Sequence, residues 1–224
     1  MPEHREECYT CRRVKANCLC GSIKPFNTRL RFVILMHEDE AKRQRTGTGR
    51  LSRLCLTNSE LIIGNDFTLD ARVNALIKDP ACAPFVLYPG PKAANFQTLG
   101  KDAFPPGKTP LIFVIDGTWR SAKSILHKSK NVSALPRLSF AGNYLSQFKF
   151  KKQPLPHCVS TIEAIYHLCQ EAETAGHDEP RPQKEVLLTV FQKMVDTQLR
   201  YSRELHRRRE ENQKKERTSR PVGK

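Results

Sequence analysis

The stretch Leu111-Ile112-Phe113-Val114-Ile115-Asp116-Gly117-Thr118-Trp119-Arg120 contains the strongest indication of the fold. Five consecutive apolar residues predict a strand that is buried on both faces, as in a parallel sheet. A carboxylate and the only tryptophan of the chain follow directly, and a helical pattern continues to residue 128. Ligands bind at the carboxyl ends of strands in open α/β sheets, so Asp116 is a candidate site residue. The sequence leaves a second interpretation open, in which Asp116 or Thr118 caps the following helix.

The alternation of apolar runs and helical periodicity extends from this stretch over most of the chain. Strands are predicted at 30–36, 61–63, 84–88 and around 138–140, and helices at 41–56, 69–78, 118–128, 160–175 and from about 183. Residues 89–110 are rich in Gly, Pro and Lys and predict a loop or lid. Strands alternating with helices favour an α/β fold, a mostly parallel sheet with helices on both faces.

The composition is strongly basic. The 224 residues include 38 Lys and Arg against 23 Asp and Glu, a formal net charge of +15. An excess of this size indicates a polyanionic partner, most often a nucleic acid, with an anionic membrane surface as the competing interpretation. The sequence shows no apolar stretch long enough to span a bilayer and no signal peptide. A soluble, cytoplasmic protein is therefore expected.

Four of the eight cysteines lie close together near the N-terminus, in the pattern Cys8-x2-Cys11-x6-Cys18-x-Cys20. Zinc takes four thiolates in a tetrahedron, and a C-x2-C pair is its usual first half. A site closed by four protein ligands is structural, and it would supply folding energy to a segment too polar to fold alone. The alternative is a disordered arm with reduced cysteines. The remaining cysteines (Cys55, Cys82, Cys158, Cys169) stand among apolar residues and are expected to be buried.

Three parts are expected along the chain. Residues 1–28 form a cysteine-rich, zinc-binding arm, residues 29–200 the α/β domain, and residues 201–224 a basic, partly disordered tail. From residue 200 onward the chain carries 10 Lys and Arg against 4 Glu. We expect the last helix to decay into this tail after Tyr201, with a secondary electrostatic role in binding nucleic acid.

Several polar groups flank the predicted strands and helices. His37 follows the strand at 30–36 and is favoured as a site residue over residues 38–40, which suit the acidic first turn of a helix. The sequence Ser160-Thr161-Ile162-Glu163 fits a capping box, and a helix N-terminus can also bind a ligand.

Two basic clusters are candidates for RNA phosphate contacts. The first cluster comprises Lys42, Arg43, Arg45, Arg50 and Arg53, where a solvated helix face is the alternative. The second comprises Lys149, Lys151 and Lys152, interleaved with Phe148 and Phe150. Such interleaving suits phosphates and stacked bases, or equally an edge strand with one solvated face.

Taken in order, these motifs resemble the DTW-domain family of RNA-modifying enzymes, from Cys8 to about residue 200. The resemblance is carried by the cysteine arm; His37 with Glu40; Thr48-Gly49; Leu87-Tyr88-Pro89; Asp116-Gly117-Thr118-Trp119; Leu135-Pro136-Arg137; and Ser160-Thr161-Ile162-Glu163-Ala164. Within the family the chain is most similar to the bacterial tRNA-uridine aminocarboxypropyltransferases. It departs from the family pattern at Glu38, where proline is usual, and near Lys151, where an arginine is usual. Lysine offers a point charge instead of the planar fork of arginine.

The resemblance implies a SPOUT-like fold with a C-terminal trefoil knot and S-adenosylmethionine as cosubstrate. It implies transfer of the 3-amino-3-carboxypropyl group to N3 of the variable-loop uridine, nucleotide 47 of the tRNA. A methyltransferase of the same fold, or a zinc-containing RNA-binding module without activity, remains an alternative. A monomer is expected.

The resemblance also implies site roles. Asp116 is the expected base, with His37 beside it on the substrate side. Leu87, Tyr88, Leu138, Ser160 and Thr161 would line the cofactor pocket. Trp119 would stack on the adenine or sulfonium, or else be a core tryptophan. The RNA-contacting residues would be Arg43, Arg45, Arg137, Lys149, Lys151 and Lys152.

Overall fold

The computed structural model describes residues 6–43, 47–100, 103–148 and 158–218. Its strands form one parallel sheet in the order β2-β1-β4-β3-β5. They are β1 (Arg31–Met36), β2 (Ser59–Ile63), β3 (Cys82–Leu87), β4 (Thr109–Asp116) and β5 (Arg137–Leu138). The apolar run 111–115 lies in β4, the central strand, which stands between β1 and β3.

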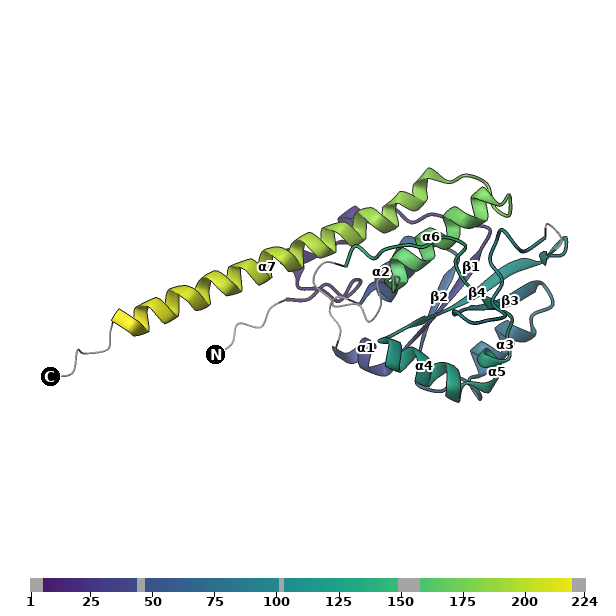
Figure 1. Cartoon of the computed structure of the whole chain (residues 1–224), viewed down its shortest axis with the longest axis horizontal. Helices are drawn as coiled ribbons and strands as arrows, with labels where there is room; N and C mark the ends of the chain where they lie inside the picture. Colours follow the sequence, from purple (N-terminus) through teal and green to yellow (C-terminus); the bar gives the residue numbers. More distant parts are fainter. Residues whose placement is uncertain (1–5, 44–46, 101–102, 149–157, 219–224) are drawn as a thin grey trace.

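Helices cover both faces of the sheet (Figure 1). On one face lie α2 (Thr48–Cys55), α6 (Thr161–Thr174) and α7 (Glu185–Thr218); on the other lie α3 (Ala71–Lys78), α4 (Trp119–Lys128) and α5 (Lys130–Ser133). Side chains alternate along each strand, so Phe32 and Ile34 join the first core while Val33 and Leu35 join the second. The predicted α/β class, a mostly parallel sheet with helices on both faces, is confirmed.

Most predicted elements lie within a few residues of the observed ones, with three differences, of which the last concerns α7. The helix expected at 41–56 is two helices, α1 (Glu38–Arg43) and α2, and residues 44–46 between them lie outside the described residues. The four-residue helix α5 was not expected, because a single helical turn carries no periodicity.

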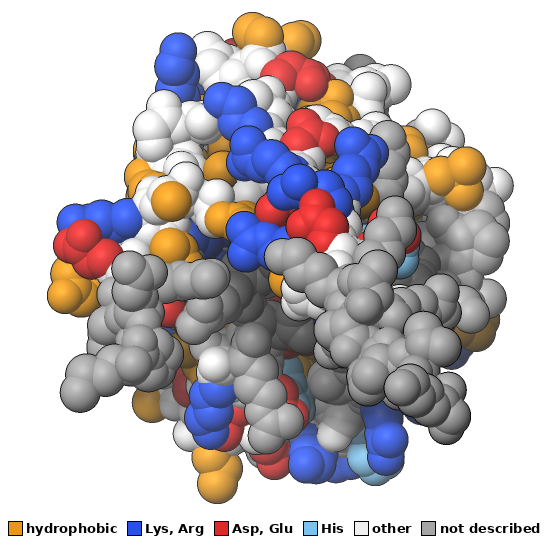
Figure 2. Space-filling view, turned by 90° about the vertical axis from the view of Figure 1, so that its left-hand side faces the viewer, with side chains coloured by type: hydrophobic (Ala, Val, Ile, Leu, Met, Phe, Trp, Pro, Cys, Tyr) orange, Lys and Arg blue, Asp and Glu red, His pale blue; other side chains and the backbone are white. Residues whose placement is uncertain are grey.

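Helix α7 does not end near Tyr201 but continues to Thr218. Beyond Arg200 its described side chains are almost all exposed, so packing does not hold it in helical form. Ion pairs one turn apart do: Arg207 lies 2.9 Å from Glu204 and 3.3 Å from Glu211, and Arg208 lies 2.8 Å from Glu204. Figure 2 views the molecule from this end and shows Lys and Arg gathered there with acidic side chains among them.

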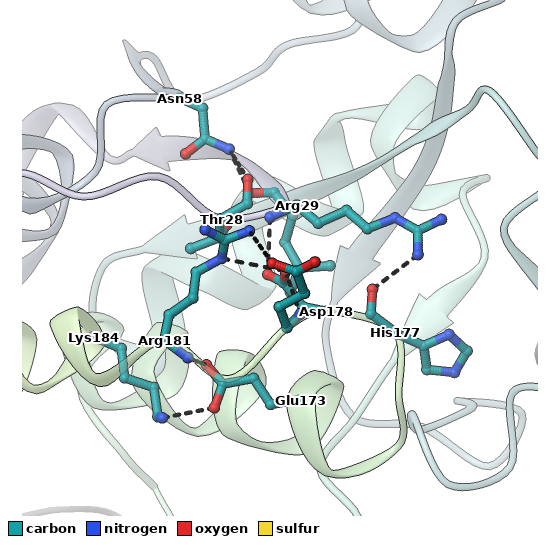
Figure 3. Close-up of polar contacts among 10 residues, drawn as sticks. Thr28, Arg29, Asn58, Glu173, His177, Asp178, Arg181 and Lys184 are labelled. Carbon is teal, nitrogen blue, oxygen red and sulfur yellow. Dashed lines mark hydrogen bonds and ion pairs between the residues drawn. The ribbon is translucent and has the colours of Figure 1, made fainter.

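A polar network ties the α6–α7 connection to the segment that enters β1 (Figure 3). The backbone N–H of Arg29 donates to Asp178 at 2.8 Å, and its guanidinium donates to the His177 carbonyl at 3.1 Å. Lys184 pairs with Glu173 at 2.6 Å. These groups lie at the amino end of the strands, so they fasten the two C-terminal helices to the sheet and leave its carboxyl end open.

Three strands end side by side at that carboxyl edge. Met36 of β1 pairs with Asp116 of β4, and Leu87 of β3 pairs with Val114 of β4. The loops that follow these strands therefore meet at one place, where ligands bind in sheets of this class. None of the helices in the described ranges has the length and apolar character that crossing a bilayer requires.

Candidate functional site

A cavity of about 640 Å³ lies at the carboxyl edge of the sheet. Its walls come from the ends of β3 and β4, from the first residues of α2, α4 and α6, and from the segment 139–148. All the residues expected to hold a cofactor lie in this wall, namely Leu87, Tyr88, Trp119, Leu138, Ser160 and Thr161, and Asp116 lies there with them. Its volume falls within the usual range for small-molecule sites, about 300–1,000 Å³.

Asp116 is a fixed, buried carboxylate. It is the last residue of β4 and is 5% exposed. The hydroxyl of Thr161, the first residue of α6, donates a hydrogen bond of 2.5 Å to its Oδ1. Asp116 does not cap α4; Thr118 does, because its hydroxyl oxygen accepts a hydrogen bond from the Ser121 N–H at 3.1 Å. The capping interpretation therefore holds for Thr118 and not for Asp116.

Trp119 is not a core residue. It is the first residue of α4 and remains 40% exposed, with its side chain in the cavity wall. Its ring lies 6.4 Å from that of Tyr88 at an angle of 58°, and the Arg137 guanidinium lies 5.5 Å from the centre of the Tyr88 ring. The two aromatic side chains form a tilted pair on one side of the cavity, a surface suited to a planar or cationic ligand.

Two buried glutamates of α6 hold the segment 141–148, which forms another wall. Glu163 is 1% exposed and completes the predicted capping box with Ser160. Its carboxylate also accepts hydrogen bonds from the Gln147 N–H at 2.6 Å and from the Ser146 hydroxyl at 2.8 Å. Glu171 accepts from the N–H groups of Ala141 and Gly142 at 2.9 and 3.0 Å.

The phenol of Tyr144, in the cavity wall, also donates to Glu171 at 2.9 Å. Burial and this carboxylate raise the pKa of Tyr144 to about 12, so the phenol stays a donor at neutral pH. Sequence reasoning missed Glu171 and Tyr144. The signal that could have found them is a second glutamate in a helix whose other residues are mostly apolar.

His37 lies beside the cavity without being among its lining residues. Its backbone N–H donates to the carbonyl of Asp116 at 2.9 Å, and its Nδ1 accepts from the Asp39 N–H at 3.1 Å. Glu40, for which the acidic first turn of a helix was the favoured interpretation, is buried in the cavity wall. The acidic turn after β1 therefore contributes a second carboxylate to the cavity.

Among the residues to which the resemblance assigns RNA contacts, Arg137 is the one whose side chain the structure describes. Arg137 begins β5 at the rim, and its Nη1 lies 3.5 Å from the Pro89 carbonyl. Arg43 is the last residue of α1, where only the backbone is described. Arg45, Lys149, Lys151 and Lys152 lie outside the described residues. For these residues the assignment stays a prediction.

The sulfur atoms of the four N-terminal cysteines lie within 4.8 Å of one another. Cys8 and Cys20 are 3.7 Å apart, and Cys11 and Cys18 are 3.8 Å apart. Four sulfurs at about 2.3 Å from a tetrahedral zinc would be about 3.8 Å apart, so this group fits zinc.

The cysteine arm packs on the rest of the fold. Cys11 and Leu19 are buried in the same core as α2, α6 and α7. Asn17 donates to the Tyr201 hydroxyl at 2.6 Å, and Lys193 donates to Ser22 at 2.8 Å. The other four cysteines (Cys55, Cys82, Cys158, Cys169) are buried, as expected.

Comparisons with known proteins agree on one family. The model of the DTW domain matches residues 5–199. The tRNA-uridine aminocarboxypropyltransferase 2 of Mus musculus is 27% identical over 207 residues, which cover 91% of this chain and 67% of that protein. The protein of the same name in Drosophila melanogaster is 25% identical over 231 residues, an alignment that covers 100% of this chain and 87% of that protein.

In Arabidopsis thaliana, tRNA-uridine aminocarboxypropyltransferase A is 25% identical over 226 residues, which cover 88% of this chain and 82% of that protein. No solved structure matches the chain. The match of the domain model spans most of the sequence, from the cysteine arm to α7. The chain therefore belongs to the DTW-domain family.

Proposed function

We propose that this protein is a tRNA-uridine aminocarboxypropyltransferase that uses S-adenosylmethionine. The names of its relatives support the activity. The observation that carries the proposal is the cavity at the carboxyl edge of the sheet, whose lining combines the buried carboxylate of Asp116 with the aromatic pair Trp119 and Tyr88. A base and an aromatic surface within one cavity suit proton removal beside a bound nucleoside.

The charge of the cavity suits this cosubstrate. Asp116 and Glu40 are both buried in the wall, and Arg120 is the cation that joins them there within the described ranges. S-adenosylmethionine carries a sulfonium and an ammonium group, and carboxylates in a partly closed cavity favour such cations. Leu87 and Leu138 provide apolar surface, and Trp119 offers its ring to the adenine or sulfonium.

When bound, S-adenosylmethionine would supply the aminocarboxypropyl group, with its sulfonium sulfur as the leaving group. We assign Asp116 as the base that accepts the N3 proton of the uridine, so that N3 can form the new bond to carbon. Thr161 holds one oxygen of this carboxylate and thereby fixes the direction of its other lone pairs. His37 supports the Asp116 backbone from the substrate side.

The remaining features of the proposal concern the partner and the chain. The substrate nucleotide is the variable-loop uridine 47, and the RNA contacts are Arg43, Arg45, Arg137, Lys149, Lys151 and Lys152. The arm holds a structural zinc through Cys8, Cys11, Cys18 and Cys20, and the protein acts as a cytoplasmic monomer. We also propose a SPOUT-like trefoil knot, which the resemblance to the DTW-domain family implies.

One experiment separates this function from its rivals. Purified protein is incubated with unmodified tRNA and S-adenosylmethionine, and the nucleosides of the digested tRNA are analysed by mass spectrometry. A gain of one aminocarboxypropyl group on uridine supports the proposal. A methyl gain indicates a methyltransferase of the same fold, and an unchanged tRNA indicates an RNA-binding module. Omitting S-adenosylmethionine is the matched control.

A further inference from the structure

A second cavity, of about 350 Å³, lies between the cysteine arm and the helices α1 and α2. Four cationic side chains line it, those of Arg12, Arg13, Lys42 and Arg50, against the single carboxylate of Glu7. Gly47, which precedes α2, lines both this cavity and the one that contains Asp116. We call the second cavity the basic pocket.

Arg13 is the unusual member of the basic pocket. Its side chain belongs to a residue that is only 5% exposed, and its Nη2 has no hydrogen-bond partner in the described part of the chain. A buried donor that lacks an acceptor is costly, and the cost is larger for a charged guanidinium.

The other cations are arranged around it. Arg12 has a left-handed backbone, with φ of 57°, and its N–H closes a turn onto the Cys8 carbonyl at 2.8 Å. This turn directs two successive arginines from the arm toward α1 and α2, where both line the pocket. Arg50 donates to the Ala41 carbonyl at 3.1 Å, and Lys42 pairs with Glu38 at 2.9 Å. Arg12, Arg13 and Arg50 therefore supply most of the uncompensated charge.

We propose that the basic pocket binds a backbone phosphate of the RNA substrate next to the target nucleotide. Planar guanidinium groups match the oxygens of a phosphodiester and bind them through paired hydrogen bonds. Even with Lys42 paired to Glu38, the three arginines of the lining outnumber its one carboxylate, Glu7. Because Gly47 borders both cavities, a phosphate held here would lie close to the nucleotide that faces Asp116.

This inference rests on the proposed function only for the identity of the RNA. It gives the cysteine arm a task beyond folding, since two of the arginines that line the pocket follow directly after the metal-binding pair Cys8 and Cys11.

The test measures how salt affects tRNA binding by the full-length, zinc-containing protein. Fluorescence anisotropy with unmodified tRNA is recorded at several salt concentrations for the wild type, Arg12→Gln, Arg50→Gln and Arg13→Lys. The matched control is Lys123→Gln, which removes an exposed cation from α4 on the opposite face of the sheet. Binding of S-adenosylmethionine and the zinc content are measured on the same preparations to show that each variant is folded.

We expect Arg12→Gln and Arg50→Gln each to weaken tRNA binding about threefold to tenfold and to reduce the slope of log K against log salt by about 0.7–0.9. Arg13→Lys keeps the charge and loses the fork, so it should weaken binding with little change in slope. Cofactor binding should stay within about twofold of the wild type. Slopes and affinities for all three variants that equal those of Lys123→Gln would overturn the inference.

The outcome is separable from that of the proposed function. If the wild type modifies uridine while the pocket variants bind tRNA as the control does, the basic pocket is wrong and the activity stands. If the variants lose affinity and slope as expected while the wild type modifies nothing, the basic pocket stands as an RNA site and the activity is wrong.

Discussion

The backbone of Gly49 in α2 lies so close to the Asp116 carboxylate that a Cβ at residue 49 would stand 2.6 Å from both Cγ and Oδ2 of Asp116. Real Cβ atoms do not approach so closely, so one of the two groups would have to move. Asp116 is also held by Thr161, which means that helix α2 and helix α6 position it together.

The first prediction concerns this approach. Gly49→Ala should displace Asp116 and lower the rate of uridine modification at least about a hundredfold, since small misplacements of a reacting group have effects of that size. Gly21→Ala is the matched control, because a Cβ at residue 21 meets no atom within 4 Å. Nucleoside mass spectrometry over time gives both rates. Equal rates for the two variants would remove Gly49 from the site.

The second prediction concerns the carboxylate itself. Asp116→Asn keeps the shape of the side chain and removes the base, so transfer should fall by about 10²–10⁴-fold while tRNA affinity stays within about twofold. Asp70→Asn is a suitable control, since Asp70 caps α3 through the Val73 N–H and asparagine caps equally well. Retention of wild-type activity in Asp116→Asn would show that another group removes the proton.

The third prediction concerns Trp119. Because this side chain is 40% exposed, Trp119→Ala should change the melting temperature little. Loss of a stacking or cation–π contact of about 1–2 kcal/mol should weaken S-adenosylmethionine binding about fivefold to thirtyfold, as measured by isothermal titration calorimetry. Trp119→Phe should recover part of that affinity. A large drop in melting temperature with unchanged cofactor affinity would instead indicate a structural role.

The fourth prediction concerns the metal. Freshly purified protein should contain about one zinc per chain, as measured by atomic emission, and Cys20→Ser should lose it and melt at a lower temperature. Cys82→Ser changes a buried cysteine outside the cluster and should keep its zinc. Substoichiometric zinc in the wild type would contradict the assignment.

The fifth prediction concerns pH. Burial lowers the pKa of His167 against the opposing effects of Glu163, Gln170 and Glu171, so the folded state binds its proton less readily than the unfolded chain does. Well above pH 6.5, which is about the pKa of histidine in the unfolded chain, His167 is neutral in both states and its burial does not change stability with pH. As pH falls below that value, the unfolded chain takes up the proton more readily, so the fold loses stability. His167→Phe retains a ring against Tyr144, which His167 contacts at 3.8 Å between ring centres.

The measurement for this prediction is urea unfolding at pH 7.5 and 5.5. The free energy of unfolding should fall more between these values for the wild type than for His167→Phe, since the other titrating groups are common to both proteins. An equal or smaller fall in the wild type would contradict the effect.

Local patterns in the sequence predicted the strands of the sheet. A strand buried on both faces is a continuous apolar run, such as 111–115, and the helices between strands show a different spacing of apolar residues. The extent of α7 was harder to predict. Net charge alone suggested a disordered tail, whereas the spacing of Glu204, Arg207 and Glu211, one turn apart, favours a helix.

Some parts of the candidate site could likewise be predicted from local sequence patterns, and others could not. Asp116 and Thr161 stand in motifs at a strand end and a helix start, where sequence patterns are informative. The hydrogen bonds that Glu171 accepts from Ala141 and Gly142 join residues about 30 apart in the sequence, and no local pattern encodes such a contact. The burial of Arg13 likewise depends on how the arm packs against α2, so in the sequence it was one basic residue among many.

The hydrogen bond between Asn17 and Tyr201 joins positions 184 residues apart, and that between Ser22 and Lys193 spans 171 residues. At ribosomal rates of about 5–20 residues per second, the cysteine arm emerges on the order of ten to thirty seconds before the helix that covers it. During that interval the thiols of the arm lack the cover of α7, and exposure makes a thiol more susceptible to oxidation. Early capture of a metal ion would protect the nascent chain from oxidation until translation supplies α7.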